Sequence, residues 1–168
     1  FGGMSLFDAV TTSLATAGTG GFGIKNNSMA DYSMYIQNVV AVFMFIFGVN
    51  FNIYFLILVR KPKEILQSEE LKTYLGIVLV ATVVIALNIS GSLSSIWVAL
   101  QQAFFQVTAI ITTTGFSTVD FNHWPELSKF ILVGLMFMGG CAGSTSGGIK
   151  ISRIIIAWKN LKNEISSF

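Results

Sequence analysis

Two short tracts decide the fold of this 168-residue chain: Gly18-Thr19-Gly20-Gly21-Phe22, the first tract, and Thr112-Thr113-Thr114-Gly115-Phe116, the second tract. A shift of 94 positions places Gly21 on Gly115 and Phe22 on Phe116. Other identities are sparse, so the order of the surrounding elements is the stronger sign of repetition. Each tract follows a short segment of mixed polarity and leads through a polar loop to a long apolar segment. The sequence therefore predicts two copies of one structural unit.

The segments before the tracts, Ser5–Ala17 and Ser94–Ile111, are predicted to be short helices, because each begins with Ser, a good helix N-cap. A helix over Ser5–Ala17 is only about 20 Å long, which is too short to cross the ~30 Å hydrocarbon core of a bilayer. Such a segment is either interfacial or re-entrant. If Tyr32–Val59 runs inward and Thr73–Ile89 returns outward, both tracts are approached from the outer side, so each short helix must enter and come back to the same face. That path is a pore loop.

The composition is that of a membrane protein. The chain is 53% hydrophobic and 11% charged, against about 25% charged residues in soluble domains, and its mean hydropathy is +0.71. Tyr32–Val59 contains 28 consecutive residues without a charge, and Thr73–Ile89 is a second apolar stretch. Both reach the ~17 residues that a span requires. The long segments after the two tracts are Ser33–Val59 and the one that begins at Glu126.

The basic residues indicate the orientation of these spans. They cluster at 60–72 and 153–168, whereas 1–31 and 90–129 contain only Lys25 and Lys129. Cytoplasmic loops collect Lys and Arg, so both clusters are predicted to face the cytoplasm. Short basic groups beside apolar spans are topology signals, and nucleic acid is not predicted to be a partner.

The two tracts have the composition of a cation filter. A dehydrated cation needs replacement oxygens, which rings of backbone carbonyls can supply. Glycine permits the required backbone conformations, and small Thr side chains can pack behind the backbone or add a hydroxyl ligand. The short helices would point their negative C-terminal ends at the same place. The alternative is a non-conducting scaffold in which the tracts are ordinary turns. The predicted filter residues are Gly18, Thr19, Gly20, Gly21, Phe22, Thr112, Thr113, Thr114, Gly115 and Phe116.

A third glycine-rich stretch, the 139–148 loop, interrupts the apolar segment that begins at Glu126. Neither flank, Glu126–Met138 or Ile149–Trp158, is long enough to span alone, so a helix broken in mid-membrane is predicted. Small polar side chains and glycines suit a loop that obstructs a wet pathway. The alternative is a continuous helix that packs through small-xxx-small motifs. The loop contains Gly139, Gly140, Cys141, Ala142, Gly143, Ser144, Thr145, Ser146, Gly147 and Gly148.

The corresponding stretch of the first copy, Gly48–Asn52, carries two Asn amides. They could line the pathway or bond neighbouring helices, and the sequence leaves both open. No nucleophile–base pair or paired-carboxylate motif is present, so no enzyme is predicted. Cys141 is the only cysteine, which excludes a disulfide within the chain.

These stretches resemble the Trk/Ktr/HKT superfamily of potassium transporters, specifically its bacterial Trk-type membrane subunit. GGCAGSTSGGIK at Gly139–Lys150, followed by Ile151-Ser152-Arg153, resembles the intramembrane gate loop of the family and the half-helix after it. ATAGTGGFG at Ala15–Gly23 and ITTTGFSTVDF at Ile111–Phe121 resemble the second-repeat and third-repeat filters.

The resemblance implies an all-α integral membrane fold of repeated helix–pore-loop–helix units, with a broken second helix in the later repeat. It implies that 1–61 belongs to repeat two, 62–72 is a cytoplasmic linker and 73–168 is repeat three, with repeats one and four outside this chain. The implied function is potassium uptake through a gated four-repeat pore in the cell membrane, with ion coupling left open. K⁺ is then the transported ion, and no bound cofactor or other metal is expected. The remaining open alternative is a sodium- or mixed-cation-conducting member of the superfamily.

The expected partners are the lipid bilayer, the remaining repeats of the parent chain, a second copy in a homodimer, and a cytoplasmic nucleotide-binding regulatory subunit. All of these follow from the resemblance alone, apart from the bilayer, which composition also predicts.

Overall fold

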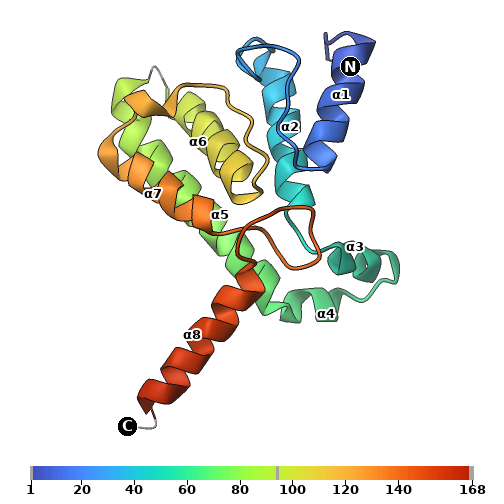
Figure 1. Ribbon diagram of the computed structural model, residues 1–168, viewed down its shortest axis with the longest axis vertical. Helices are drawn as coiled ribbons and strands as arrows, with labels where there is room; N and C mark the ends of the chain where they lie inside the picture. Colours follow the sequence, from blue (N-terminus) through green and yellow to red (C-terminus); the bar gives the residue numbers. More distant parts are fainter. Residues whose placement is uncertain (1, 94, 167–168) are drawn as a thin grey trace.

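The computed structural model describes residues 2–93 and 95–166, and this part of the chain is built from helices without β-strands (Figure 1). Residues 1, 94, 167 and 168 lie outside the described part. Ser94 is where the second short helix was predicted to begin, and the other three stand at the ends of the two predicted repeats. In chain order the elements are α1 (Leu6–Ala17), α2 (Met34–Phe47), α3 (Phe51–Leu58), α4 (Pro62–Gln67), α5 (Glu69–Ile89), the 3-10 turn η1 (Ser90–Ser92), α6 (Ile96–Ile111), the 3-10 turn η2 (Phe121–His123), α7 (Glu126–Phe137) and α8 (Ile151–Ser166). The all-α prediction is confirmed.

The two short helices that precede the tracts are α1 and α6. The side-chain oxygen of Ser5 accepts a hydrogen bond from the Asp8 amide at 3.1 Å and caps α1 as predicted. The cap of α6 is Ser95, whose hydroxyl accepts from the Trp97 amide at 3.3 Å. Both helices stop immediately before their tracts, at Ala17 and Ile111.

The larger core lies where α5 packs against α6 and α7. The side of α6 that contributes to this core is lined by the small residues Ala99 and Ala103, which let the bulkier side chains of α5 approach closely. Tyr74 and Ile85 of α5 are completely buried there. Leu79 on α5 is 64% exposed, so this helix also presents an apolar surface to its surroundings, as a helix in contact with lipid would.

A smaller core joins the two copies. It contains Ile36, Val40 and Met44 of α2 together with Phe105 and Ala109 of α6. Helix α2 lies between α1 and α6 and contacts both (Figure 1). Helix α6 of the second copy therefore packs on α2 of the first.

The apolar segment of the first copy is broken, which the sequence reading missed. Ser33–Val59 was expected to run as one segment, with a break only in the later copy, but α2 and α3 meet at an angle of 89°. Gly48 ends α2, and the Asn50 side chain caps α3 by accepting from the Asn52 amide at 2.9 Å. At this turn the Gly48 carbonyl accepts a hydrogen bond from a residue far along the chain, the Cys141 amide, at 2.9 Å.

The predicted break of the later copy is present. Helix α7 ends at Phe137, α8 begins at Ile151, and the residues between them are not helical, so the continuous packed helix is wrong. Within the described residues, Glu69–Ser92 is the one helix long and apolar enough to cross a membrane alone, and α2 with α3 qualifies as a second span if the bent pair is counted together.

Replacing Asn50 with Ala should lower the free energy of unfolding of the full-length protein by about 1 kcal/mol, because the first turn of α3 loses its cap. The measurement is the thermal unfolding midpoint in detergent. Asn52→Ala, in the exposed first turn of the same helix, is the matched control. An equal shift for both variants would show that the cap is not what stabilises this turn.

Candidate ion filter and gate loop

The first and second tracts follow the same backbone path. The residues that end the two helices, Gly18 and Thr112, have φ of −83° and −84°, both with ψ of 0°. The next residues, Thr19 and Thr113, both lie in the left-handed region, with φ of 50° and 55°. Two positions later, Gly21 and Gly115 have φ of 67° and 84°. The backbone thus repeats more closely than the sequence does.

The hydrogen bonds of the tracts repeat with the same shift. The Gly20 amide donates to the Ala15 carbonyl at 2.8 Å, and the Thr114 amide donates to the Ala109 carbonyl at 2.9 Å. Because the N–H and C=O of a trans peptide point in opposite directions, these bonds turn the preceding carbonyls, those of Thr19 and Thr113, away from the helix ends. Two further bonds repeat in the same way. The Gly18 amide donates to the Leu14 carbonyl, as the Thr112 amide does to the Thr108 carbonyl. The Thr19 amide donates to the Thr16 carbonyl, as the Thr113 amide does to the Ile110 carbonyl.

The two tracts are in direct contact. A Cβ atom built on Gly21 would overlap the carbonyl oxygen of Thr114, so only glycine allows the first tract to approach the second this closely. No other residue comes within 4 Å of a Cβ built on Gly115 in the described chain. The two glycines share a backbone conformation, but only Gly21 is also confined by a neighbour.

The hydroxyls of the second tract divide into two groups. Thr112 and Thr114 are buried, their hydroxyls lie 2.7 Å apart, and the Thr112 hydroxyl is also 2.7 Å from the Thr108 carbonyl. They pack behind the tract, as the sequence predicts for small Thr side chains. The Thr113 hydroxyl instead accepts a hydrogen bond from the Gly147 amide at 2.6 Å, in the 139–148 loop.

The 139–148 loop lies against both tracts. The hydroxyl of Thr19 donates to the Thr145 carbonyl at 3.0 Å, while that of Thr113 accepts from the Gly147 amide. Thr19 and Thr113 are equivalent residues of the two copies. One loop therefore closes over the same position of both tracts.

The loop is also bonded to itself. The Ser146 hydroxyl accepts from the Gly140 amide at 2.9 Å, and the Lys150 ammonium donates to the Ser146 carbonyl. The Gly139 amide donates to the Ile149 carbonyl at 2.8 Å, which brings the ends of the loop together. These bonds satisfy backbone groups that no helix or sheet serves, as a segment at membrane depth requires.

The loop is bonded to the break between α2 and α3 of the first copy. The Cys141 amide donates to the Gly48 carbonyl at 2.9 Å, and the Phe51 amide donates to the Gly143 carbonyl at 3.1 Å. For the Asn50 amide the sequence left open whether it lines the pathway or bonds a neighbouring helix. Its side-chain oxygen accepts from the Asn52 amide and so caps its own helix, α3. The break at 48–50 is therefore the seat of the loop.

The sequence reading did not identify Glu70 as part of this site. One oxygen of its carboxylate accepts from the Ala142 amide at 2.6 Å and from the Ser152 amide at 3.1 Å. Glu70 follows the N-cap Ser68 of α5, where an acidic residue is ordinary, so its position gave no signal. Among the described residues, no group of three or more His, Cys, Asp or Glu side chains could hold a metal ion.

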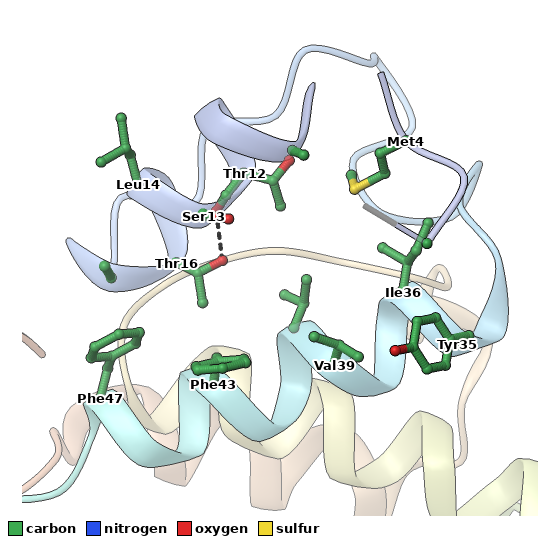
Figure 2. Close-up of a pocket in the computed structure, with 14 residues that line it drawn as sticks. Met4, Thr12, Ser13, Leu14, Thr16, Tyr35, Ile36, Val39, Phe43 and Phe47 are labelled. Atoms are coloured by element: carbon green, nitrogen blue, oxygen red, sulfur yellow. Dashed lines mark hydrogen bonds between the residues drawn. The ribbon is translucent and has the colours of Figure 1, made fainter. Parts of the chain in front are cut away.

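A separate cavity of about 440 Å³ lies between α1 and α2 (Figure 2). Its lining is mostly apolar, with Val39 and Phe43 of α2 facing α1. The Thr16 hydroxyl at its edge donates to the Thr12 carbonyl of its own helix at 2.7 Å. The cavity therefore suits an apolar side chain or a lipid tail better than a cation.

The fold and these contacts define a helical membrane protein of repeated helix–pore-loop–helix units. The sequence model of the TrkH family, described as cation transport protein, matches residues 2–167. The chain belongs to this family.

Several relatives support the assignment. The Trk system potassium uptake protein TrkH of Escherichia coli K12 is 36% identical over 98% of this chain, and TrkG of the same strain is 31% identical over 98%. The crystal structure of the potassium transporter TrkH from Vibrio parahaemolyticus superposes with a TM-score of 0.90 at 34% identity, over 98% of this chain and 36% of the other. This chain spans about a third of the length of these relatives, 35% of the E. coli TrkH.

Replacing Gly21 with Ala should destabilise the full-length protein by more than the strain of its left-handed backbone alone. That strain costs about 1–2 kcal/mol, and the new side chain also collides with the Thr114 carbonyl. The measurement is the thermal unfolding midpoint of the purified protein, with Gly134→Ala in an open position of α7 as control. A Gly21→Ala shift relative to Gly134→Ala that does not exceed about 1–2 kcal/mol would contradict the contact between the tracts.

Proposed function

We propose that this chain forms part of a gated pore that takes up potassium ions across the cell membrane. The observation that carries the proposal is the pair of equivalent left-handed turns at Thr19–Gly21 and Thr113–Gly115, each at the end of a short helix and both contacted by the 139–148 loop. The tracts would supply backbone carbonyls to a dehydrated cation, and the helix C-termini would add a favourable negative potential. The loop would be the gate.

The exposure of one aromatic residue supports further repeats around the pore. Phe116 is 1% exposed and shares a buried cluster with Val40 and Met44 of the first copy. Its equivalent, Phe22, is 86% exposed. If every repeat packs on the one before it, Phe22 would be covered by the repeat that precedes this one.

The apolar cavity between α1 and α2 supports the same arrangement. In the second copy, α5 packs against both the pore helix α6 and the inner helix α7. The first copy offers the corresponding pair, α1 and α2, with an apolar cavity between them (Figure 2). We propose that an outer helix equivalent to α5 lies there, so that 1–61 and 73–168 belong to two of four repeats and 62–72 links them.

The basic clusters support a cytoplasmic position for the linker. Helices α4 and α8, which lie in the two clusters at 60–72 and 153–168, are at the same end of the molecule (Figure 1). We place this end in the cytoplasm of a multi-pass protein of the cell membrane. A homodimer and a nucleotide-binding regulatory subunit at this end belong to the proposal, on the strength of the family resemblance.

Potassium is proposed as the transported ion because the relatives are named potassium uptake proteins. No enzymatic role and no bound cofactor are proposed. The competing candidates are a sodium- or mixed-cation pore and a non-conducting scaffold.

The test is rubidium uptake by the full-length parent protein in bacteria stripped of their own potassium uptake. Gly115→Val should abolish uptake at equal membrane expression, because a β-branched side chain does not tolerate a φ of 84°. Gly134→Ala in α7 is the control. Uptake that equals the wild type in Gly115→Val would reject the filter, and competition by sodium as strong as by potassium would favour the mixed-cation pore.

Phe22→Ser should destabilise the full-length protein about as much as Phe116→Ser does, by ~3 kcal/mol or more, because both side chains would be buried between repeats. Phe22→Leu, which keeps an apolar side chain, should restore most of the loss. The thermal unfolding midpoint and the yield of assembled protein measure the effect. A Phe22→Ser protein as stable as the wild type would contradict the preceding repeat.

A further inference from the structure

Glu70 connects the two ends of the 139–148 loop. Its Oε1 atom accepts a hydrogen bond from the Ala142 amide, near the start of the loop, at 2.6 Å. The same atom accepts from the Ser152 amide, in the first turn of α8, at 3.1 Å. A single oxygen on α5 thus holds both the loop and the half-helix that follows it.

The charge of the carboxylate suits this position. The first amides of a helix have no partner within the helix, and the helix N-terminus carries a partial positive charge, so a carboxylate is favoured beside Ser152. Hydrogen bonds to a charged acceptor are also stronger than neutral ones. Glu70 is half-buried, which protects both bonds from water.

The two elements that Glu70 joins differ in how firmly they are held. Helix α5 is packed into the larger core against α6 and α7. Helix α8 extends away from the rest of the molecule (Figure 1), and beyond its first turns its apolar side chains are largely exposed, with Trp158 at 70% and Ile165 at 75%. A force on α8 would therefore move α8 relative to α5, and the Ser152 amide would leave Glu70.

We propose that Glu70 is a positioning residue that latches the gate closed, so that the placement of α8 against α5 sets how often the 139–148 loop leaves the tracts. This inference rests on the proposed function of the loop as a gate. Movement of α8 away from α5 breaks the bond to Ser152, and because the loop is covalently joined to α8, the same movement draws Ala142 away from the Glu70 carboxylate. Of the bonds between the loop and other elements, those to the tract threonines and to the break after α2 then remain.

The neighbouring carboxylate provides a matched control. Glu69 pairs with Lys159 on the exposed surface of α8, whereas the Ala142 and Ser152 amides are both bonded to Glu70. Glu69→Gln removes an α5–α8 contact without touching the latch. Glu70→Ala removes both latch bonds, whereas Glu70→Gln keeps an acceptor oxygen and removes only the charge.

Cys141 provides a reporter of the loop itself. It is 1% exposed and lies beside Ala142. In full-length protein whose other cysteines have been replaced, its rate of modification by a small charged thiol reagent measures how often the loop leaves its seat. This readout requires no ion flux.

The experiment compares four proteins: the wild type, Glu70→Ala, Glu70→Gln and Glu69→Gln. It measures rubidium flux into proteoliposomes, the rubidium-to-sodium flux ratio and the Cys141 modification rate. Loss of a charge-assisted bond should shift the closed–open balance by about tenfold. Glu70→Ala should thus raise both basal flux and Cys141 modification by about tenfold, with Glu70→Gln between it and the wild type. The flux ratio should stay at the wild-type value, because the tracts are unchanged. Glu69→Gln, which loses only a solvent-exposed ion pair, should change flux and Cys141 modification far less than Glu70→Ala does.

The outcomes separate the latch from the pore. If Glu70→Ala folds with a normal unfolding midpoint but leaves Cys141 modification unchanged, the latch is rejected. A Glu70→Ala protein that only unfolds earlier, with Glu70→Gln indistinguishable from the wild type in both readouts, would also reject it in favour of a structural cap. A Glu70→Ala protein in which Cys141 modification rises but rubidium flux does not would reject the proposed function and leave the latch standing.

Discussion

Every irregular stretch of this protein that lies at membrane depth must find hydrogen-bond partners inside the protein, and this requirement organises the structure. The two tracts, the break after α2 and the 139–148 loop are all irregular, and they meet in one layer. Thr113 bonds Gly147, and Gly48 bonds Cys141. Each irregular segment supplies the donors or acceptors that another lacks, so none of them would be stable at that depth without the others.

The same constraint explains why the two tracts share a backbone while differing in sequence. The left-handed turns and the bonds back to the helix ends are fixed by geometry, and both Thr19 and Thr113 adopt them. The positions around them are free to vary. Where the second tract has the buried hydroxyls of Thr112 and Thr114 behind it, the first has Gly18 and Gly20, and the close approach between the tracts is at Gly21 instead.

Sequence reasoning succeeded where the signal is local. The tracts, the end of each pore helix and the break between α7 and α8 all carry Gly, Thr or Ser in short runs, and such runs predict irregular backbone directly. The break at Gly48 was missed because its flanks are apolar and because the partner of its carbonyl, the Cys141 amide, lies far along the chain. Glu70 was missed for a similar reason, since an acidic residue in a first helical turn needs no distant partner to explain it. The filter and gate roles of the residues remain predictions.

The position of the loop accounts for the use of unequal repeats in one chain. A single loop reaches equivalent threonines of both copies, so its proposed position is near the axis that the copies share. Under the proposed function this one loop would obstruct the filter, whereas four identical subunits would bring four loops. The first copy instead contributes a short break whose Gly48 carbonyl and Phe51 amide receive the loop. Joining different repeats covalently lets one copy carry the gate and another carry its seat, which identical subunits cannot do.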